Sequence, residues 1–219
     1  YIIDVAVVIG LLVLAMPVFQ RGSAGKNLLL LGLAGIFAQW FSHPALFILA
    51  GIGSAIVIHF LQVREYSNVR AAVLMGLLWL ANLAALYFIN LRDLSRNAYL
   101  SAYWTEGFIP LPPWSSLNWL SELITYQFDI RLIPLLVSIL ILAGWFMLFK
   151  EKRSPALAFA FILLFSFTAS ALRLYPVNGR LSLFLIPPGI LLLGKTVEFS
   201  RRVFFQNKLA SIGGAIVLS

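Results

Sequence analysis

Three kinds of residue are scarce in this chain of 219 residues, and each shortage excludes a class of protein or site. The chain has no cysteine, which excludes disulfides and thiolate metal sites. Two histidines and eight acidic residues are too few to favour a metal centre, and we expect no metal and no other cofactor. Charged residues make up 11%, against about 25% in soluble domains, so a water-soluble fold would lack polar residues for its surface.

Apolar residues make up 61% of the chain and fall into blocks separated by short charged clusters. The blocks are about as long as the helix that crosses a bilayer core of about 30 Å. The sequence therefore predicts an all-α, polytopic helical membrane protein with about seven to eight transmembrane helices, forming a single transmembrane domain over residues 1–219. The predicted spans are residues 1–19, 27–42, 44–62, 71–91, 132–149, 156–173 and 181–198, with a further one beginning at 209.

The second and third spans need a separate argument, because no formal charge divides them apart from His43. One straight helix over residues 27–62 would measure about 54 Å, nearly twice the hydrocarbon thickness. Two crossings fit better, with a turn at Phe41–Pro44, since a proline disfavours helical geometry at the residue before it.

Two local patterns predict how the helices pack and bend. The stretches Gly32–Gly35 (GLAG) and Leu49–Ala55 (LAGIGSA) supply small residues that let helices approach closely. Pro187 and Pro188 predict a kink inside the last complete span.

The connections between spans differ in charge, which predicts their side of the membrane. Alternate connections form two sets, one with 11 basic and 3 acidic residues and the other with 5 of each. Basic residues collect in cytoplasmic loops, so the first set is predicted to be cytoplasmic. Orientation then explains the net charge of +8, and we expect no nucleic-acid partner.

Residues 92–131 form the longest predicted extracytoplasmic loop, too long for a simple connector and rich in tryptophan and tyrosine. From Leu117 to Phe128 apolar residues recur at helical spacing, which predicts an interfacial helix lying on the membrane. The loop is either an anchor in the headgroup zone or, as we favour, one wall of a binding site. Glu106 is its candidate carboxylate, with a solvated loop charge as the alternative.

Two further polar residues fall on the same predicted outer face. His43 could bind a phosphate or exchange protons, or it could cap a helix end. Asp4 is costly in hydrocarbon, which makes it a functional candidate, although its place near the interface weakens that argument.

Arg180 is the main candidate for binding an anionic ligand. Its planar guanidinium carries five donors that suit phosphate oxygens, and the predicted helix start at residues 179–182 adds backbone N–H groups. Tyr175, Asn178 and Arg173 lie on the same turn and favour a specific anion. Ordinary lipid headgroups are the alternative ligand.

Three stretches, taken in order, resemble a known family. They are FSHPALFILAGIG (Phe41–Gly53), YWTEGFIPLPP (Tyr103–Pro113) and YPVNGRLSLFLIPPGILLL (Tyr175–Leu193). Together they resemble the C-terminal half of a bacterial family in the GT-C glycosyltransferase superfamily, the dolichyl-phosphate-mannose-transferase-like group. The chain begins at Tyr1, inside an apolar segment, and we expect it to be a fragment of a longer chain.

The resemblance implies an enzyme of the bacterial cytoplasmic membrane that moves a sugar from a polyprenyl-phosphate carrier to an acceptor on the outer side. Its partners would be membrane lipid, the lipid-linked sugar and the missing N-terminal part of the same chain. In such families the catalytic base is an acidic residue of the first outer loop, which this sequence does not contain. The base is therefore not transferred to Asp4 or Glu106, and the fragment is expected to be inactive alone.

Two other functions remain open at this stage. A transporter or flippase for an amphiphilic substrate would need polar residues along a path near the membrane midplane. Few such residues are present beyond Asn82, Ser138, Ser166 and Thr168, which argues against coupled ion transport. A non-catalytic membrane scaffold would show no pocket around the His43 and Arg180 turns, and a structure with those turns far apart would favour it.

Overall fold

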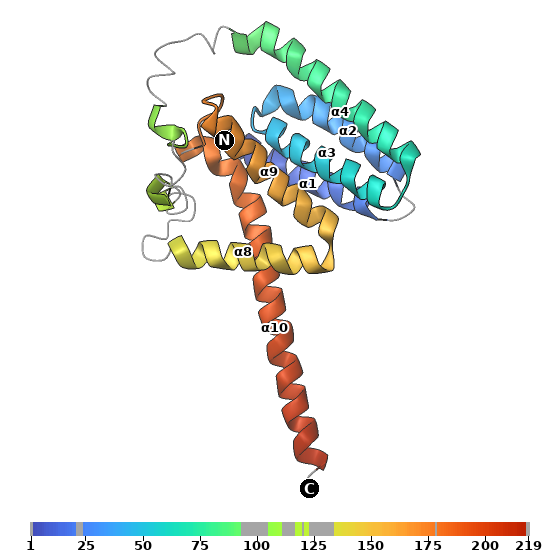
Figure 1. Ribbon diagram of the computed structural model, residues 1–219, viewed down its shortest axis with the longest axis vertical. Helices are drawn as coiled ribbons and strands as arrows, with labels where there is room; N and C mark the ends of the chain where they lie inside the picture. Colours follow the sequence, from blue (N-terminus) through green and yellow to red (C-terminus); the bar gives the residue numbers. More distant parts are fainter. Residues whose placement is uncertain are drawn as a thin grey trace.

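The computed structural model describes residues 2–20, 24–92, 105–110, 117–119, 121–122, 134–177 and 179–217, and these residues contain helices and turns but no strand. The all-α class predicted from the sequence is confirmed (Figure 1). The helices are α1 (Ile2–Ala15), η1 (Met16–Phe19), α2 (Ala24–Phe41), α3 (Ala45–Gln62), α4 (Tyr66–Leu86), η2 (Tyr87–Leu91), η3 (Thr105–Gly107), α8 (Pro134–Glu151), α9 (Arg153–Ala171), η5 (Gly179–Leu185) and α10 (Ile186–Val217).

Each of the predicted spans up to residue 198 coincides with a helix. Five helical stretches in the described residues are long and apolar enough to cross a membrane: Ile2–Phe19, Ala45–Gln62, Tyr66–Asn90, Arg153–Ala171 and Gly179–Arg202. Two further predicted spans are filled by α2 and α8, which have 18 residues each. The chain is therefore an integral membrane protein of helical type.

The predicted break between the second and third spans is confirmed at residues 42–44. Pro44 precedes α3 as its N-cap residue, and the turn is closed by backbone hydrogen bonds. The Ala45 N–H donates to the Ser42 carbonyl at 3.2 Å, and the Leu46 N–H donates to the His43 carbonyl at 3.3 Å. α2 and α3 therefore form a helical hairpin rather than one long helix.

The prediction of a separate helix beginning at residue 209 is wrong. α10 runs from Ile186 to Val217 without interruption, about 48 Å at 1.5 Å per residue. Residues 199–208 contain no glycine or proline, so nothing in the chain breaks the helix there. In Figure 1 α10 crosses α8 and projects beyond the other helices.

Pro187 and Pro188 do not kink the interior of a helix. They lie in the first turn of α10, where the 3-10 helix η5 passes into the α-helix. Proline is tolerated in the first turn because its missing N–H would have no intrahelical acceptor there. The two prolines thus mark a helix start.

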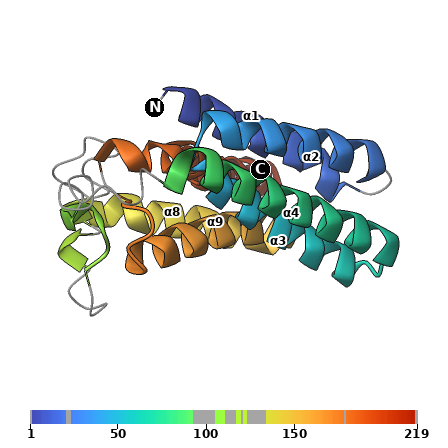
Figure 2. The same ribbon diagram turned by 90° about the horizontal axis from the view of Figure 1, so that it is seen from above.

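The helices place the connections at two opposite ends (Figures 1 and 2). We call the end with Asp4, residues 42–44, 105–110 and 172–180 the loop end. We call the opposite end, with residues 62–65 and 151–153, the basic end. At the basic end, His59 of α3 contacts two other elements. Its Nδ1 lies 2.8 Å from Ser154 Oγ of α9, and its ring centroid lies 5.6 Å from that of Phe19 in η1. α3 packs against α1, α4 and α9, and its interior position explains its many buried residues.

Close packing at the small residues is confirmed. A Cβ on Gly51 would lie 2.7 Å from the Ile162 backbone nitrogen and 3.0 Å from the Ala158 carbonyl, so only glycine lets α3 and α9 approach this far. A Cβ on Gly35 would lie 2.6 Å from the Trp79 ring. Both predicted small-residue stretches therefore serve helix contacts.

We predict that Gly51→Ala destabilises the protein by about 1–3 kcal/mol, because the added methyl group overpacks the α3–α9 contact. The measurement is thermal unfolding of the purified protein in detergent. Gly10→Ala is the matched control, since nothing lies within 4 Å of a Cβ at Gly10. Equal stability of the two variants would contradict the proposed contact.

Candidate functional site

Asp4 joins α1 to the turn between α2 and α3. The Ser42 hydroxyl donates a hydrogen bond to Asp4 Oδ1 at 2.7 Å, and Ser42 is 2% exposed. This bond offsets part of the cost of placing a carboxylate near hydrocarbon. Asp4 thus has a structural partner, whereas the neighbouring His43 side chain is exposed.

Tyr175 holds the turn that carries Arg180 against the start of α3. Its ring lies 5.1 Å from the Phe47 ring and 6.3 Å from the Phe184 ring, and Phe47 and Phe184 stack at 5.9 Å. Its hydroxyl donates to the Leu181 carbonyl at 3.1 Å, which closes the turn around Arg180. Tyr175 therefore positions the turn rather than facing solvent.

Arg180 is the second residue of η5, and its side chain is exposed. The predicted helix start at residues 179–182 is a 3-10 helix of seven residues and not the N-terminus of an α-helix. Gly179 has a φ of 56°, which suits glycine, and its carbonyl accepts a hydrogen bond from Ser182 Oγ at 2.8 Å. The exposed guanidinium is consequently the group at this turn best placed to meet an anion.

Arg173 ends α9 in a left-handed conformation, with a φ of 58°. Its N–H donates to the Ser170 carbonyl at 3.0 Å, and the Leu174 N–H donates to the Ala169 carbonyl at 2.8 Å. These two bonds define a Schellman motif, whose left-handed position is usually glycine because glycine has no Cβ. The Arg173 side chain is exposed at the loop end.

The same motif occurs at the opposite end of the bundle. Arg64 has a φ of 60°, its N–H donates to the Leu61 carbonyl at 3.2 Å, and the Glu65 N–H donates to the Phe60 carbonyl at 2.9 Å. Because an arginine occupies this position at both ends, the backbone strain at Arg173 belongs to the helix end and does not by itself mark a binding site.

The described part of the long predicted loop packs against the end of α9 and the turn that follows it. The Ile109 N–H donates to Ser170 Oγ at 3.0 Å. The Trp119 ring meets the Phe167 ring at 6.4 Å, and both Trp119 and Val177 are buried in one small apolar cluster. The loop therefore covers part of the loop end, as a wall of a site there would.

Some of the predicted features lie outside the described residues. Glu106 has its backbone in η3, but its side chain is not described, and neither is Asn178. Residues 117–119 and 121–122 are helical, as predicted, while the position of this helix at the membrane interface stays a prediction. The rest of that helix stays a prediction.

The loop end includes Asp4, His43, Arg173, Tyr175 and Arg180, which come from three segments of the chain: α1, the α2–α3 turn, and the stretch from the end of α9 into η5. Two cavities, of about 610 and 330 Å³, lie between the helices. A group of three or more potential metal-ligating residues is absent from the described ranges. The arrangement presents exposed positive and polar groups, which suit the phosphate oxygens of an anionic headgroup.

Fold and site together define a helical integral membrane protein with a polar, arginine-bearing end. Comparison with protein-family models, curated proteins and solved structures found no match for this chain.

A polar network between α2 and α4 was not predicted as a unit from the sequence. Asn82 Nδ2 donates to the Ile36 carbonyl and to Gln39 Oε1, both at 3.1 Å, and Asn82 Oδ1 accepts from Trp40 Nε1 at 3.1 Å. In the sequence, Asn82 stands out only as an isolated polar residue within a predicted span. The signal that could have identified the network is that Gln39 also interrupts an apolar span.

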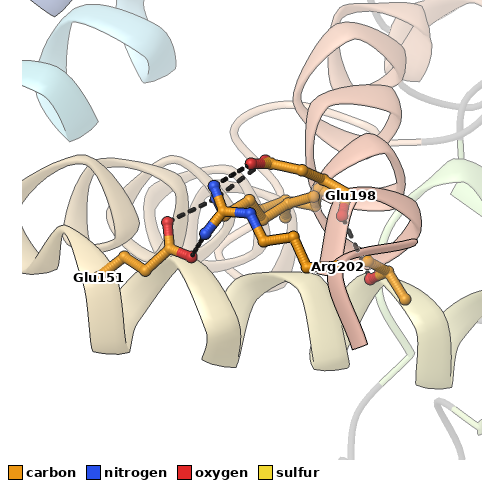
Figure 3. A network of polar contacts seen from close by, with 6 residues as sticks. Glu151, Glu198 and Arg202 are labelled. Carbon is orange, nitrogen blue, oxygen red and sulfur yellow. Dashed lines mark hydrogen bonds and ion pairs between the residues drawn. The ribbon is translucent and has the colours of Figure 1, made fainter. Parts of the chain in front are cut away.

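A second network joins α8 to α10 near the basic end (Figure 3). Glu151 on α8 forms an ion pair with Lys195 and lies 3.5 Å from Arg202. Lys195 and Arg202 also pair with Glu198 on their own helix. Its members are partly exposed, so solvent screens each ion pair. The network joins α8 to α10 away from the loop end.

We predict that Arg173→Gly and Arg64→Gly each raise stability by about 0.5–1 kcal/mol, because glycine relieves the left-handed strain. Thermal unfolding in detergent measures the effect. Arg173→Ala and Arg64→Ala are the controls, since they remove the charge but keep a Cβ. A gain of the same size in the alanine variants would show that charge, not backbone strain, sets the stability at these positions.

Proposed function

We propose that the chain is the C-terminal part of a glycosyltransferase of the bacterial cytoplasmic membrane. This enzyme moves a sugar from a polyprenyl-phosphate carrier to an acceptor on the extracytoplasmic side, which the loop end faces. The proposal joins the resemblance of three ordered sequence stretches to the polar character of one end of the bundle.

One observation carries the proposal: the aromatic contact between the start of α3 and the Arg180 turn. Phe47 lies one helical turn after His43, and its ring meets both Tyr175 and Phe184. The contact brings the His43 turn and the Arg180 turn to the same place in the fold. The packing of α3 on α9 brings the two turns together, and the exposed arginines at the same end supply the donors that the proposed site needs.

Within this proposal Arg180 binds the phosphate of the carrier. As the glycosidic bond breaks, the phosphate leaving group gains negative charge, which a fixed guanidinium stabilises. Arg173 and His43 are further exposed donors at the loop end, and Tyr175 positions the turn through its bond to the Leu181 carbonyl. The catalytic base is supplied by a part of the enzyme outside these 219 residues.

The geometry gives less support to a transporter or flippase. The polar residues inside the bundle, chiefly Asn82 and Gln39, are hydrogen-bonded to one another and to a backbone carbonyl. In the part of the chain that the structure describes, these two residues join neighbouring helices, whereas a transport path requires a series of polar sites across the membrane.

We predict that the purified chain binds undecaprenyl phosphate in detergent and that Arg180→Ala weakens this binding about 10- to 100-fold. That range corresponds to the loss of a charge-assisted hydrogen bond worth about 1.5–3 kcal/mol. Binding is measured by titration of the immobilised protein with the lipid.

Arg70→Ala is the matched control for this titration, since it removes an exposed arginine at the basic end. An Arg180→Ala variant with unchanged affinity would remove Arg180 from the proposed site. Sugar transfer by the 219 residues alone would contradict the separate inference that the base lies elsewhere.

The orientation is testable because the chain has no cysteine of its own. We predict that a membrane-impermeant maleimide labels His43→Cys in intact bacterial cells but labels Ser67→Cys only after permeabilisation, since both positions are exposed but lie at opposite ends. The reverse pattern would place the loop end in the cytoplasm and exclude transfer on the outer side.

A further inference from the structure

A groove of about 610 Å³ lies between α3 and α4, with Phe161 of α9 at its side. Small residues on the two helices leave the space, among them Ala50, Gly53 and Gly76. A Cβ added at Gly76 would have no atom within 4 Å, so the groove is open at this position of α4. The size and the mainly apolar lining are those of ligand pockets, which hold few polar groups.

One of those few polar groups carries an unused hydrogen-bond donor. Gln39 lines the groove from α2 and is 4% exposed. Among the residues that the structure describes, its Nε2 has no hydrogen-bond partner. A buried amide N–H without an acceptor costs about 1–3 kcal/mol, which calls for an explanation.

The orientation of the Gln39 amide follows from its neighbours. The Trp40 indole can only donate and the Ile36 carbonyl can only accept, so together they fix which atom of the Asn82 amide faces each. Asn82 Nδ2 then donates to Gln39 at 3.1 Å, and the Gln39 atom that accepts must be Oε1. The hydrogen-bond network thus fixes the orientation of the Gln39 amide, and Nε2 is the atom without a partner.

The dimensions of the groove match one leaflet of a bilayer. Along α3 the lining runs from Leu46 to Ile58, about 18 Å at 1.5 Å per residue, against about 15 Å for half of the hydrocarbon core. Gln39 lies four residues before His43, about 6 Å below the loop-end turn. The unpaired donor thus lies near the boundary between hydrocarbon and headgroups.

We propose that this groove binds one acyl chain of a glycerophospholipid of the loop-end leaflet, and that a shift of the Gln39 side chain on binding exposes Nε2, which is enclosed in the free protein, so that it donates a hydrogen bond to the ester carbonyl. An acyl chain spans one leaflet and ends in an ester oxygen at the depth of Gln39. A polyprenyl chain exceeds one leaflet and carries no ester there. The site shares no residue with the Arg180 turn, so it stands independently of the proposed sugar transfer.

The test is lipid analysis by native mass spectrometry of the protein purified in mild detergent. We expect the unaltered protein to retain one phospholipid. Gly76→Leu fills the groove and loses that lipid, whereas Gly10→Leu, the same change at another position with open space, retains it. Gln39→Met removes the donor at similar size and weakens phospholipid binding by roughly fivefold, the loss of one neutral hydrogen bond.

Added phospholipid provides a second measurement that does not depend on one variant folding. It should raise the unfolding temperature of the unaltered protein and of Gly10→Leu, and raise that of Gln39→Met less, because a ligand stabilises the state that binds it. The proposal is overturned if Gly76→Leu retains phospholipid as the unaltered protein does, if Gln39→Met binds it unchanged, or if the retained lipid is a polyprenyl phosphate.

Discussion

The contact of α3 with α9 at Gly51 is the interaction on which the rest of the structure depends. In a bilayer, helices gain little from the hydrophobic effect and associate through close packing and hydrogen bonds. Gly51 removes the side chain that would separate the two backbones. With α9 fixed in this way, its following turn meets the start of α3, and the rings of Phe47, Tyr175 and Phe184 can close the loop end.

The sequence predicted the features that follow from length, composition and backbone sterics. The spans followed from hydrophobic length, the break at Pro44 from helix length and proline geometry, and the contact at Gly51 from residue size. The continuous course of α10 was not predicted, because an apolar stretch after residue 208 looks the same whether the helix turns back or runs on. The 3-10 helix that begins at Gly179 was not predicted either. Proline lacks the N–H that would bond a preceding carbonyl, and the sequence does not say which other donors that carbonyl finds.

The candidate residues show a different limit of sequence reasoning. Arg173, Tyr175 and Arg180 were grouped by sequence proximity, yet they differ in surroundings: Tyr175 is packed inside an aromatic cluster, whereas both arginines are exposed. The partner of Asp4, Ser42, lies 38 positions away and the partner of Asn82, Gln39, lies 43 positions away. Pairings over such distances depend on the tertiary arrangement, which one sequence without aligned relatives does not encode in its local pattern.

The link between α2 and α4 also has a consequence for biogenesis. The three side-chain hydrogen bonds of Asn82 described above all go to α2, and Trp79 of α4 donates to the Gly32 carbonyl of the same helix at 3.0 Å. As the chain enters the membrane, these groups stay unpaired until α4 has followed α2 and α3. These four hydrogen bonds can form only when α2 and α4, residues 24–86, are together in the membrane, and a translocon that releases helices singly would expose these polar groups to lipid.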